Sequence, residues 1–343
     1  MFPKTSQSAR TAALLEGAPY LALVERCCPV CESTKNRVVA QGIDFEYRSC
    51  SNTFTFVECG ECKTVFLNPC PKTEDFGVIY PRDYYSFQKE DTAKRRNALV
   101  QRAWDVLERR RIEMFRRLLG EGDKRVLDLG CGTGRLLRIL RSYGNAQWRL
   151  CGVEFGISEE DRAAAARDGM AIYRGMYEET HFAEAPFDLI VAQQVVEHAI
   201  SPARILAKAF ADLAPGGYAV FDTPNYDGVD RKLFPRTAWG GYHFPRHATL
   251  FTPTTFAILA EKQGFRVERR IRLISPVFWV LSVHNAMIDL GAPTSLADKI
   301  HYQTLPLLAA STFVEVLNAA VRGESSNMRI VLRKPRGSKG SGA

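Results

Sequence analysis

Two kinds of segment are absent from this chain of 343 residues. It has no uncharged apolar run of about 18 residues, so we expect no membrane span. Its first residues lack the pattern of a secretory signal peptide, so we expect a cytoplasmic protein. Acidic charge is in deficit, with 38 Asp and Glu against 46 Lys and Arg, and the net charge of +8 mildly favours an anionic partner.

The nine cysteines are not distributed as in a secreted disulfide scaffold, because seven of them precede residue 71. Four form two Cys-x-x-Cys pairs, Cys28 with Cys31 and Cys59 with Cys62. Each pair can present two sulfurs from one tight turn, and two such turns complete a tetrahedral Zn²⁺ site. Cys27 is a rival ligand, but the Cys-Pro-x-Cys turn favours Cys28. Because protein atoms fill all four positions, we expect a structural zinc ion.

The composition and the cysteine positions predict two units. Residues 26–90 would form a zinc ribbon followed by a tyrosine-rich linker, with strands over Phe45–Tyr47 and Thr53–Val57. Residues 91–335 would form the larger unit, which begins with a basic amphipathic helix over 92–120. Within it, the apolar segments of 276–322 form a helical insertion that caps a pocket or provides the face of a homodimer.

Residues 126–137 have the organisation of a nucleotide-binding turn. The apolar run Val126–Leu129 predicts a buried strand, the glycines Gly130, Gly132 and Gly134 predict a tight turn, and an apolar-periodic segment predicts a helix. The G-x-G-x-x-G spacing of dinucleotide-binding turns is missing. The spacing is G-x-G-x-G instead, and Asp128 lies two residues before the first glycine.

This pattern resembles motif I of the class I S-adenosylmethionine (SAM) methyltransferases. The resemblance implies an α/β fold with a Rossmann-like seven-stranded sheet and SAM as cofactor. It also implies that Asp128 faces the cationic amino-acid end of SAM and that the glycine loop packs beneath the cofactor. Glu154 ends the next predicted strand, about twenty residues past the glycines, where a carboxylate can accept both ribose hydroxyl protons.

The resemblance places further cofactor contacts after the next two strands. Met176 and Tyr177 stand where the family contacts adenine, but many relatives have an acid there, so we expect backbone and packing contacts. Gln193 or Gln194 would bond the SAM backbone. The pair Glu197-His198 that follows resembles quinone O-methyltransferases, in which an acid at the position of Gln194 helps to hold a divalent metal. Because this chain has glutamine instead of that acid, we expect a structural role for the pair.

The segment 226–252 combines glycines, aromatic residues and two histidines, as expected of a loop over a methyl-acceptor pocket. A hydroxyl or carbon-acid acceptor must lose a proton, and a histidine can accept it. His243 and His247 are therefore the candidate catalytic bases, with structural hydrogen bonding as the alternative for both. Tyr242 and Arg246 are candidate substrate contacts, the arginine for a phosphate.

The combination of a zinc ribbon, a tyrosine-rich linker and motif I resembles a subgroup of bacterial methyltransferases, several of which methylate sugars or other biosynthetic intermediates. This resemblance makes Tyr84 and Tyr85 candidate substrate contacts. We expect methyl transfer to oxygen or carbon of a small acceptor that is sugar-like, phosphorylated or nucleotide-linked. The alternatives are an RNA methyltransferase that uses the zinc ribbon and the basic helix for binding, and a non-catalytic SAM-binding protein. The clamp Asn/Asp-Pro-Pro-Tyr/Phe is missing, which counts against a nucleic-acid amino group.

Overall fold

The structure is a computed structural model that describes residues 14–81, 84, 98–234, 237–300, 304–321 and 323–337. Tyr85 and residues 92–97 of the predicted basic helix lie outside the described residues. The strands are β1 (Asn36–Gly42), β2 (Phe54–Cys59), β3 (Val65–Leu67), β4 (Arg125–Leu129), β5 (Arg149–Glu154), β6 (Ala171–Arg174), β7 (Phe187–Gln193), β8 (Leu213–Pro224), β9 (Thr249–Leu250), β10 (Arg266–Leu273) and β11 (Asn327–Arg333). The helices are η1 (Thr73–Asp75), α2 (Phe76–Ile79), α3 (Ala98–Leu119), α4 (Arg135–Tyr143), α5 (Glu159–Arg167), η4 (Tyr177–Glu179), α6 (Pro202–Asp212), α7 (Val229–Leu233), η5 (Gly240–Tyr242), α8 (Pro253–Lys262), α9 (Pro276–Asp289), α10 (Thr294–Ala297) and α11 (Leu305–Val321).

The main sheet has seven strands in the order β10-β11-β8-β7-β4-β5-β6. β4 pairs in parallel with both β5 and β7, while β11 runs antiparallel between β8 and β10. This is the Rossmann-like sheet that the sequence predicts. The chain reverses its strand order between β4 and β7, and ligands of such sheets bind at the carboxyl ends of the strands beside that switch.

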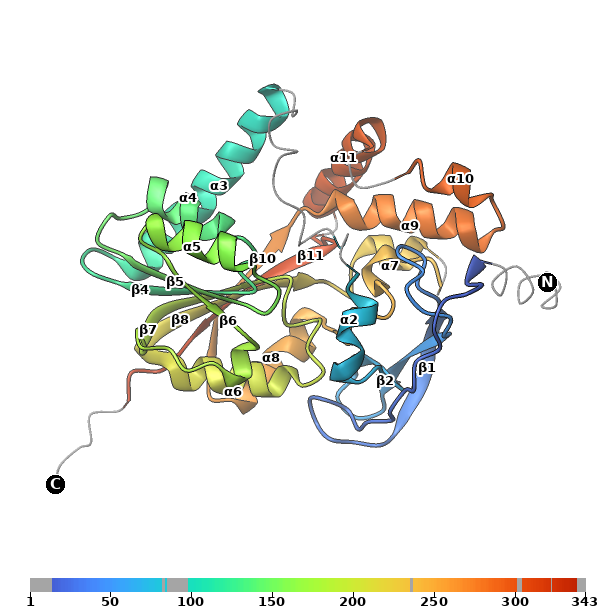
Figure 1. The fold of residues 1–343 in the computed structure, drawn as a ribbon, viewed down its shortest axis with the longest axis horizontal. Coiled ribbons are helices and arrows are strands. Elements are labelled where there is room, and N and C mark those ends of the chain that lie inside the picture. Colours follow the sequence, from blue (N-terminus) through green and yellow to red (C-terminus); the bar gives the residue numbers. More distant parts are fainter. Residues whose placement is uncertain are drawn as a thin grey trace.

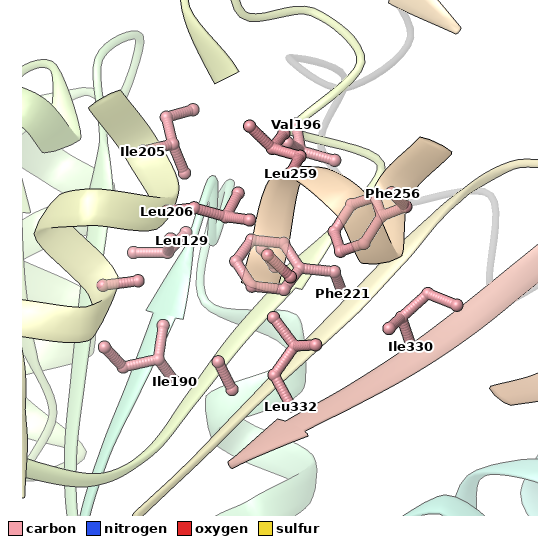
Figure 2. Close-up of a cluster of buried hydrophobic side chains, with 14 of the residues drawn as sticks. Leu129, Ile190, Val196, Ile205, Leu206, Phe221, Phe256, Leu259, Ile330 and Leu332 are labelled. Atoms are coloured by element: carbon pink, nitrogen blue, oxygen red, sulfur yellow. The ribbon is translucent and has the colours of Figure 1, made fainter. Parts of the chain in front are cut away.

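Helices cover both faces of this sheet (Figure 1). α3, α4 and α5 lie on one face, and α6 and α8 lie on the other. Figure 2 shows the second face, where Leu206 of α6 and Phe256 of α8 pack against Phe221 of β8. Each of these three side chains is fully buried. A rigid, two-sided core of this kind holds the strand ends, and the residues that follow them, in fixed positions.

The N-terminal segment forms a second sheet in the order β1-β2-β3-β9. Its last strand, β9, comes from the region beyond β8, so the two units share a sheet. The strand predicted at Phe45–Tyr47 is wrong, because these residues form a turn. The Asp44 carboxylate accepts the backbone N–H groups of Tyr47 and Ser49, and this local hydrogen bonding competes with a strand.

The apolar insertion is helical, as the sequence predicts. It forms α9, α10 and α11, which lie together beside the N-terminal sheet in Figure 1. Arg48 pairs with Asp298, just after α10, at 2.6 Å, so the insertion also contacts the N-terminal unit. None of the helices in the described ranges is long and apolar enough to cross a membrane.

Candidate active site

The turn between β4 and α4 requires glycine at its first position for two reasons. Gly130 has a positive φ of 64°, and a Cβ atom there would lie 2.7 Å from Cγ2 of Val195. Gly132 and Gly134 also have positive φ, of 52° and 86°. The structure thus places all three predicted glycines in one left-handed turn at the carboxyl end of β4, where the backbone can approach a ligand closely.

Two carboxylates flank this turn. Glu154, at the end of β5, accepts the N–H groups of Gly132 and Gly156, each at 3.1 Å, so its side chain is anchored to the glycine turn. Asp128 lies in β4 and is 4% exposed. Burial raises the pKa of Asp128 to about 7, while the charge of Arg111 lowers it and that of Glu154 raises it. A cationic ligand beside Asp128 would favour its ionised form.

Arg111 was not anticipated from the sequence, where it is one basic residue among several on the predicted helix. Its side chain is 11% exposed and forms an ion pair with Glu108 on the same helix, α3. Its Nε atom is buried without a hydrogen-bond partner in the described structure. Because its charge acts on Asp128, Arg111 places a guanidinium group at the cofactor side of the sheet.

Gln193 and Gln194 lie where β7 ends, and both are held by Asp222 of β8. The Gln193 side chain donates to the Asp222 carboxylate at 3.1 Å, and the backbone N–H of Gln194 donates to the Asp222 carbonyl oxygen at 2.8 Å. Arg329 of β11 clamps the same carboxylate with two hydrogen bonds of 2.7 Å. The sequence did not indicate this buried pair, which fixes the strand end beside the glycine turn.

Met176 and Tyr177 follow β6, as predicted, but the tyrosine side chain is committed to packing. Its hydroxyl group donates to Asp212 at 3.0 Å, and its ring is 6% exposed and packs beside Phe182. Lys208 lies over the same ring. Met176 and the backbone of this segment therefore remain as the candidate adenine contacts.

Three histidines come together beyond the carboxyl ends of β7 and β8. The ring centroids of His243 and His247 are 5.0 Å apart, and that of His198 is 4.7 Å from His247. The two candidate bases are thus neighbours, and His198 joins them. The Tyr80 ring contacts both His198 and Phe155, the residue after Glu154, with centroids 6.1 Å apart in each case. The cluster therefore adjoins the cofactor side.

Burial determines the charge of two of these histidines. It lowers the pKa of His198 to about 3 and that of His247 well below its usual value, and nearby His243 lowers both further. His247 Nδ1 lies 2.8 Å from the carbonyl oxygen of Gly241. A carbonyl can only accept, so Nδ1 carries the proton and the lone pair of His247 is on Nε2.

Glu197 holds in place the loop that carries His243 and His247. Its carbonyl oxygen accepts the N–H groups of Ala248 and Thr249 at 2.7 and 3.0 Å. Its side chain, together with His198 and His247, offers three ligand-type atoms within 4.8 Å of one another. Burial raises the pKa of Glu197 to about 8, and neither oxygen of its carboxyl group has a hydrogen-bond partner in the described structure.

His243 is the histidine with a carboxylate partner. Its Nδ1 lies 2.8 Å from Glu46 Oε2, and its Nε2 lies 3.4 Å from the hydroxyl oxygen of Tyr84. Its backbone is left-handed, with φ of 40°, an uncommon conformation for a residue other than glycine. Such conformations occur where the surroundings force a side chain into position.

The other two predicted substrate contacts have structural surroundings. Tyr242 is buried, with its ring stacked on Phe244 at 5.3 Å between centroids. The Arg246 guanidinium is fully buried and donates to the two Asp44 oxygens at 3.0 and 2.9 Å. It also faces the Tyr47 ring at 4.3 Å. Because its terminal nitrogens are engaged with Asp44, Arg246 does not present them to a phosphate.

The four predicted zinc ligands come together from the turn before β1 and from the turn between β2 and β3. Cys28 Sγ lies 3.4 Å from Cys62 Sγ, and Cys31 Sγ lies 3.5 Å from Cys59 Sγ. All four sulfurs are within 4.8 Å of one another, whereas Cys27 is exposed and not among them. Sulfurs bound to one Zn²⁺ at about 2.3 Å would be roughly 3.8 Å apart, so the arrangement fits a tetrahedral ion and not disulfides.

The sheet order, the glycine turn and the two carboxylates define a class I SAM-dependent methyltransferase. Residues 97–269, half of the chain, match the sequence profile of the family described as "Methyltransferase domain". The chain belongs to this family.

Individual relatives match shorter stretches. Ubiquinone biosynthesis O-methyltransferase of Caulobacter sp. (strain K31) is 35% identical over 106 residues, which cover 29% of this chain and 41% of the relative. The enzyme of the same name from Stutzerimonas stutzeri is 31% identical over 107 residues, covering 30% and 45%. The chain thus spans less than half the length of these curated relatives.

Two solved structures resemble this chain at low sequence identity. A putative sarcosine dimethylglycine methyltransferase from Galdieria sulphuraria is 14% identical, with a TM-score of 0.48 and coverage of 73% of this chain and 93% of that one. The 1,6-didemethyltoxoflavin-N1-methyltransferase of Burkholderia thailandensis, bound to S-adenosylhomocysteine, is 15% identical, with a TM-score of 0.47 and coverage of 80% and 97%.

Proposed function

We propose that this methyltransferase acts on an oxygen atom, or an acidic carbon atom, of a small biosynthetic acceptor, and that His243 removes the acceptor proton. The observation that carries the proposal is the histidine cluster, which adjoins the cofactor side through Tyr80. His247 and His198 are neutral at neutral pH, so they can line the acceptor pocket without adding charge.

The residues at the strand ends support the binding of SAM. Asp128 would face its ammonium group and Glu154 its ribose hydroxyls, with Gly130–Gly134 beneath it and Met176 and Gln193 beside it. When bound, SAM supplies an electrophilic methyl group. The protein orients the acceptor in line with that group, excludes water through the aromatic walls of Tyr80 and Tyr84, and accepts the proton at a histidine nitrogen.

The relatives named ubiquinone biosynthesis O-methyltransferase support oxygen over carbon as the methylated atom. A sugar-like acceptor fits the same chemistry, because a sugar hydroxyl group also has to lose a proton. An RNA acceptor has less support, because the chain lacks the clamp Asn/Asp-Pro-Pro-Tyr/Phe of nucleic-acid amino-group methyltransferases. We therefore retain a small acceptor, of the phenolic or the sugar type.

We also propose that Cys28, Cys31, Cys59 and Cys62 hold a structural Zn²⁺ ion. Cys28 and Cys59 are buried and continuous with the core that contains the main sheet, so the ion would link two turns to that core. A metal that joins two distant turns in this way would add folding free energy to the sheet that these turns flank.

Calorimetry and turnover assays test the proposal. Wild type should bind S-adenosylhomocysteine, Asp128→Ala and Glu154→Ala should lose at least tenfold in affinity, and the exposed control Glu121→Ala should not. Turnover would be followed by release of S-adenosylhomocysteine with 3,4-dihydroxybenzoate, dTDP-glucose and a short single-stranded RNA. Loss of turnover in His243→Asn with retained cofactor binding supports the assigned base, and full turnover in that variant rejects it.

A further inference from the structure

We propose that Glu46, from the N-terminal unit, is a positioning residue for the general base His243. This inference rests on the proposed function and deepens it. It gives the cysteine-containing unit a second role, because a residue of that unit would set the proton-accepting nitrogen of the active site.

The first observation is the geometry at the two ring nitrogens of His243. Nδ1 faces Glu46 Oε2 at 2.8 Å, and Nε2 faces the Tyr84 hydroxyl at 3.4 Å. A carboxylate has no proton to donate, so the neutral imidazole beside it carries its proton on Nδ1 and its lone pair on Nε2. Nε2 therefore carries the lone pair that can accept a proton, and in this structure the Tyr84 hydroxyl donates to it.

The second observation is that both partners are largely buried. The His243 side chain is 6% exposed and that of Glu46 is 13% exposed, so water screens their attraction weakly. His243 Nδ1 has no hydrogen-bond partner of standard geometry in the described structure, so its interaction with Glu46 is mainly electrostatic. A nearby anion stabilises the imidazolium that forms when Nε2 takes up the acceptor proton.

The third observation is that a neighbouring ion pair fixes the distance between the two segments. Asp44 precedes Glu46 by two residues, and Arg246 follows His243 by three. The Asp44–Arg246 pair is fully buried, and Asp44 also accepts the N–H groups of Tyr47 and Ser49. The turn that carries Glu46 is thus held rigidly against the loop that carries His243.

The other charged and titratable groups around His243 do not replace Glu46. His198 and His247 are neutral, the Arg246 charge is balanced by Asp44, and Tyr47 and Tyr84 are phenols. Glu46 is the anion of the described structure within ion-pair distance of the His243 ring. Its removal should leave the imidazolium without a compensating charge.

The test compares Glu46→Gln with Glu74→Gln, an exposed control in the same N-terminal unit. Protein labelled with ¹⁵N-histidine would be titrated by NMR, and the His243 signals would be assigned with His243→Asn. In wild type and Glu74→Gln, the long-range ¹H–¹⁵N pattern should show the proton on Nδ1. In Glu46→Gln, both tautomers should be present.

The same variants would be assayed for turnover with whichever of the three acceptors above is methylated. Glu46→Gln should lower kcat by about tenfold or more, within the roughly 10²–10⁴-fold contribution of a general base. It should move the acidic limb of the pH–rate profile and leave affinity for S-adenosylhomocysteine unchanged. Glu46→Asp, which keeps the charge, should recover part of the rate and thereby exclude a general folding defect.

Two results separate this inference from the proposed function. If the His243 tautomer is the same in wild type and Glu46→Gln, the positioning role of Glu46 is rejected even if His243 is essential. If His243→Asn retains full turnover, the base assignment fails whatever the NMR shows.

Discussion

The buried pair Asp44–Arg246 should be one of the larger single contributions to the stability of this protein. Both side chains are fully buried, and their two hydrogen bonds join residues 202 positions apart in the chain. Removing one partner of such a pair leaves an uncompensated buried charge, which costs about 3–5 kcal/mol in the free energy of unfolding.

The structure predicts which of the two single variants loses more of the free energy of unfolding. In Arg246→Met, Asp44 keeps the N–H groups of Tyr47 and Ser49 and the Ser49 hydroxyl, so we expect the lower end, about 3 kcal/mol. In Asp44→Asn, the Arg246 guanidinium stays charged and keeps its hydrogen bond to the Phe244 carbonyl, so we expect the upper end, about 5 kcal/mol. The double variant should be more stable than the sum of the two losses predicts.

Urea unfolding, followed by both tryptophan fluorescence and circular dichroism, measures these losses. The Arg246 charge holds the pKa of Asp44 below its usual value. The stabilisation by the ion pair is therefore present above the unfolded-state pKa of Asp44, about 3.9, and is lost as pH falls through its lower folded-state pKa. The difference in free energy of unfolding between wild type and Asp44→Asn should therefore become smaller below about pH 4. A loss under about 1 kcal/mol in Asp44→Asn, or strict additivity in the double variant, would refute this reasoning.

Three further predictions concern the cofactor and zinc sites. Because burial raises the pKa of Asp128 to about 7, the wild type should lose stability as pH rises from about 4 to 7. At pH 8, Asp128→Asn should be more stable than the wild type, by at most about 4 kcal/mol in the free energy of unfolding. Urea unfolding at pH 5 and pH 8 measures this, and an equal stability of the two proteins at pH 8 would contradict it. Gly130→Ala should lose about 1–3 kcal/mol in the free energy of unfolding and most of its cofactor affinity, because the added Cβ would clash with Val195. Calorimetry should show partly recovered affinity in the double variant with Val195→Ala. Wild-type affinity in Gly130→Ala would contradict the clash. Cys28→Ser should lose bound zinc by elemental analysis and unfold at lower temperature, whereas Cys27→Ser should retain the metal; the reverse result would make Cys27 the ligand in place of Cys28.

The main sheet could be predicted from the sequence because its signals are local. Continuous apolar runs give β4, β5 and β7, and the glycines with positive φ lie where the spacing places them. The prediction failed where a long-range contact decides the structure. Phe45–Tyr47 alternates like a strand, but the neighbouring Asp44 turns the chain and pairs with Arg246.

Side-chain roles were predictable only in part, for the same reason. Residue type and spacing identify His243 as a candidate base, but its partner Glu46 lies in a segment that the pattern assigned to a strand. Tyr177 and Tyr242 have the composition of ligand contacts, yet their rings are buried in the core. Which face of the chain an aromatic residue presents depends on packing partners that a single sequence does not reveal.

The pairing of β9 with β3 also has a consequence for synthesis on the ribosome. The N-terminal sheet lacks its last strand until Leu250 has emerged, roughly 180 residues after Leu67, which takes on the order of 10–40 s of translation. During that time the β3 edge is open and Arg246 has not yet reached Asp44. The cysteine-containing unit therefore depends on a strand from the other unit. In a fragment that ends before Thr249, the β3 edge of its sheet would have no partner strand. A fusion of this unit to another methyltransferase would have to include β9 as well.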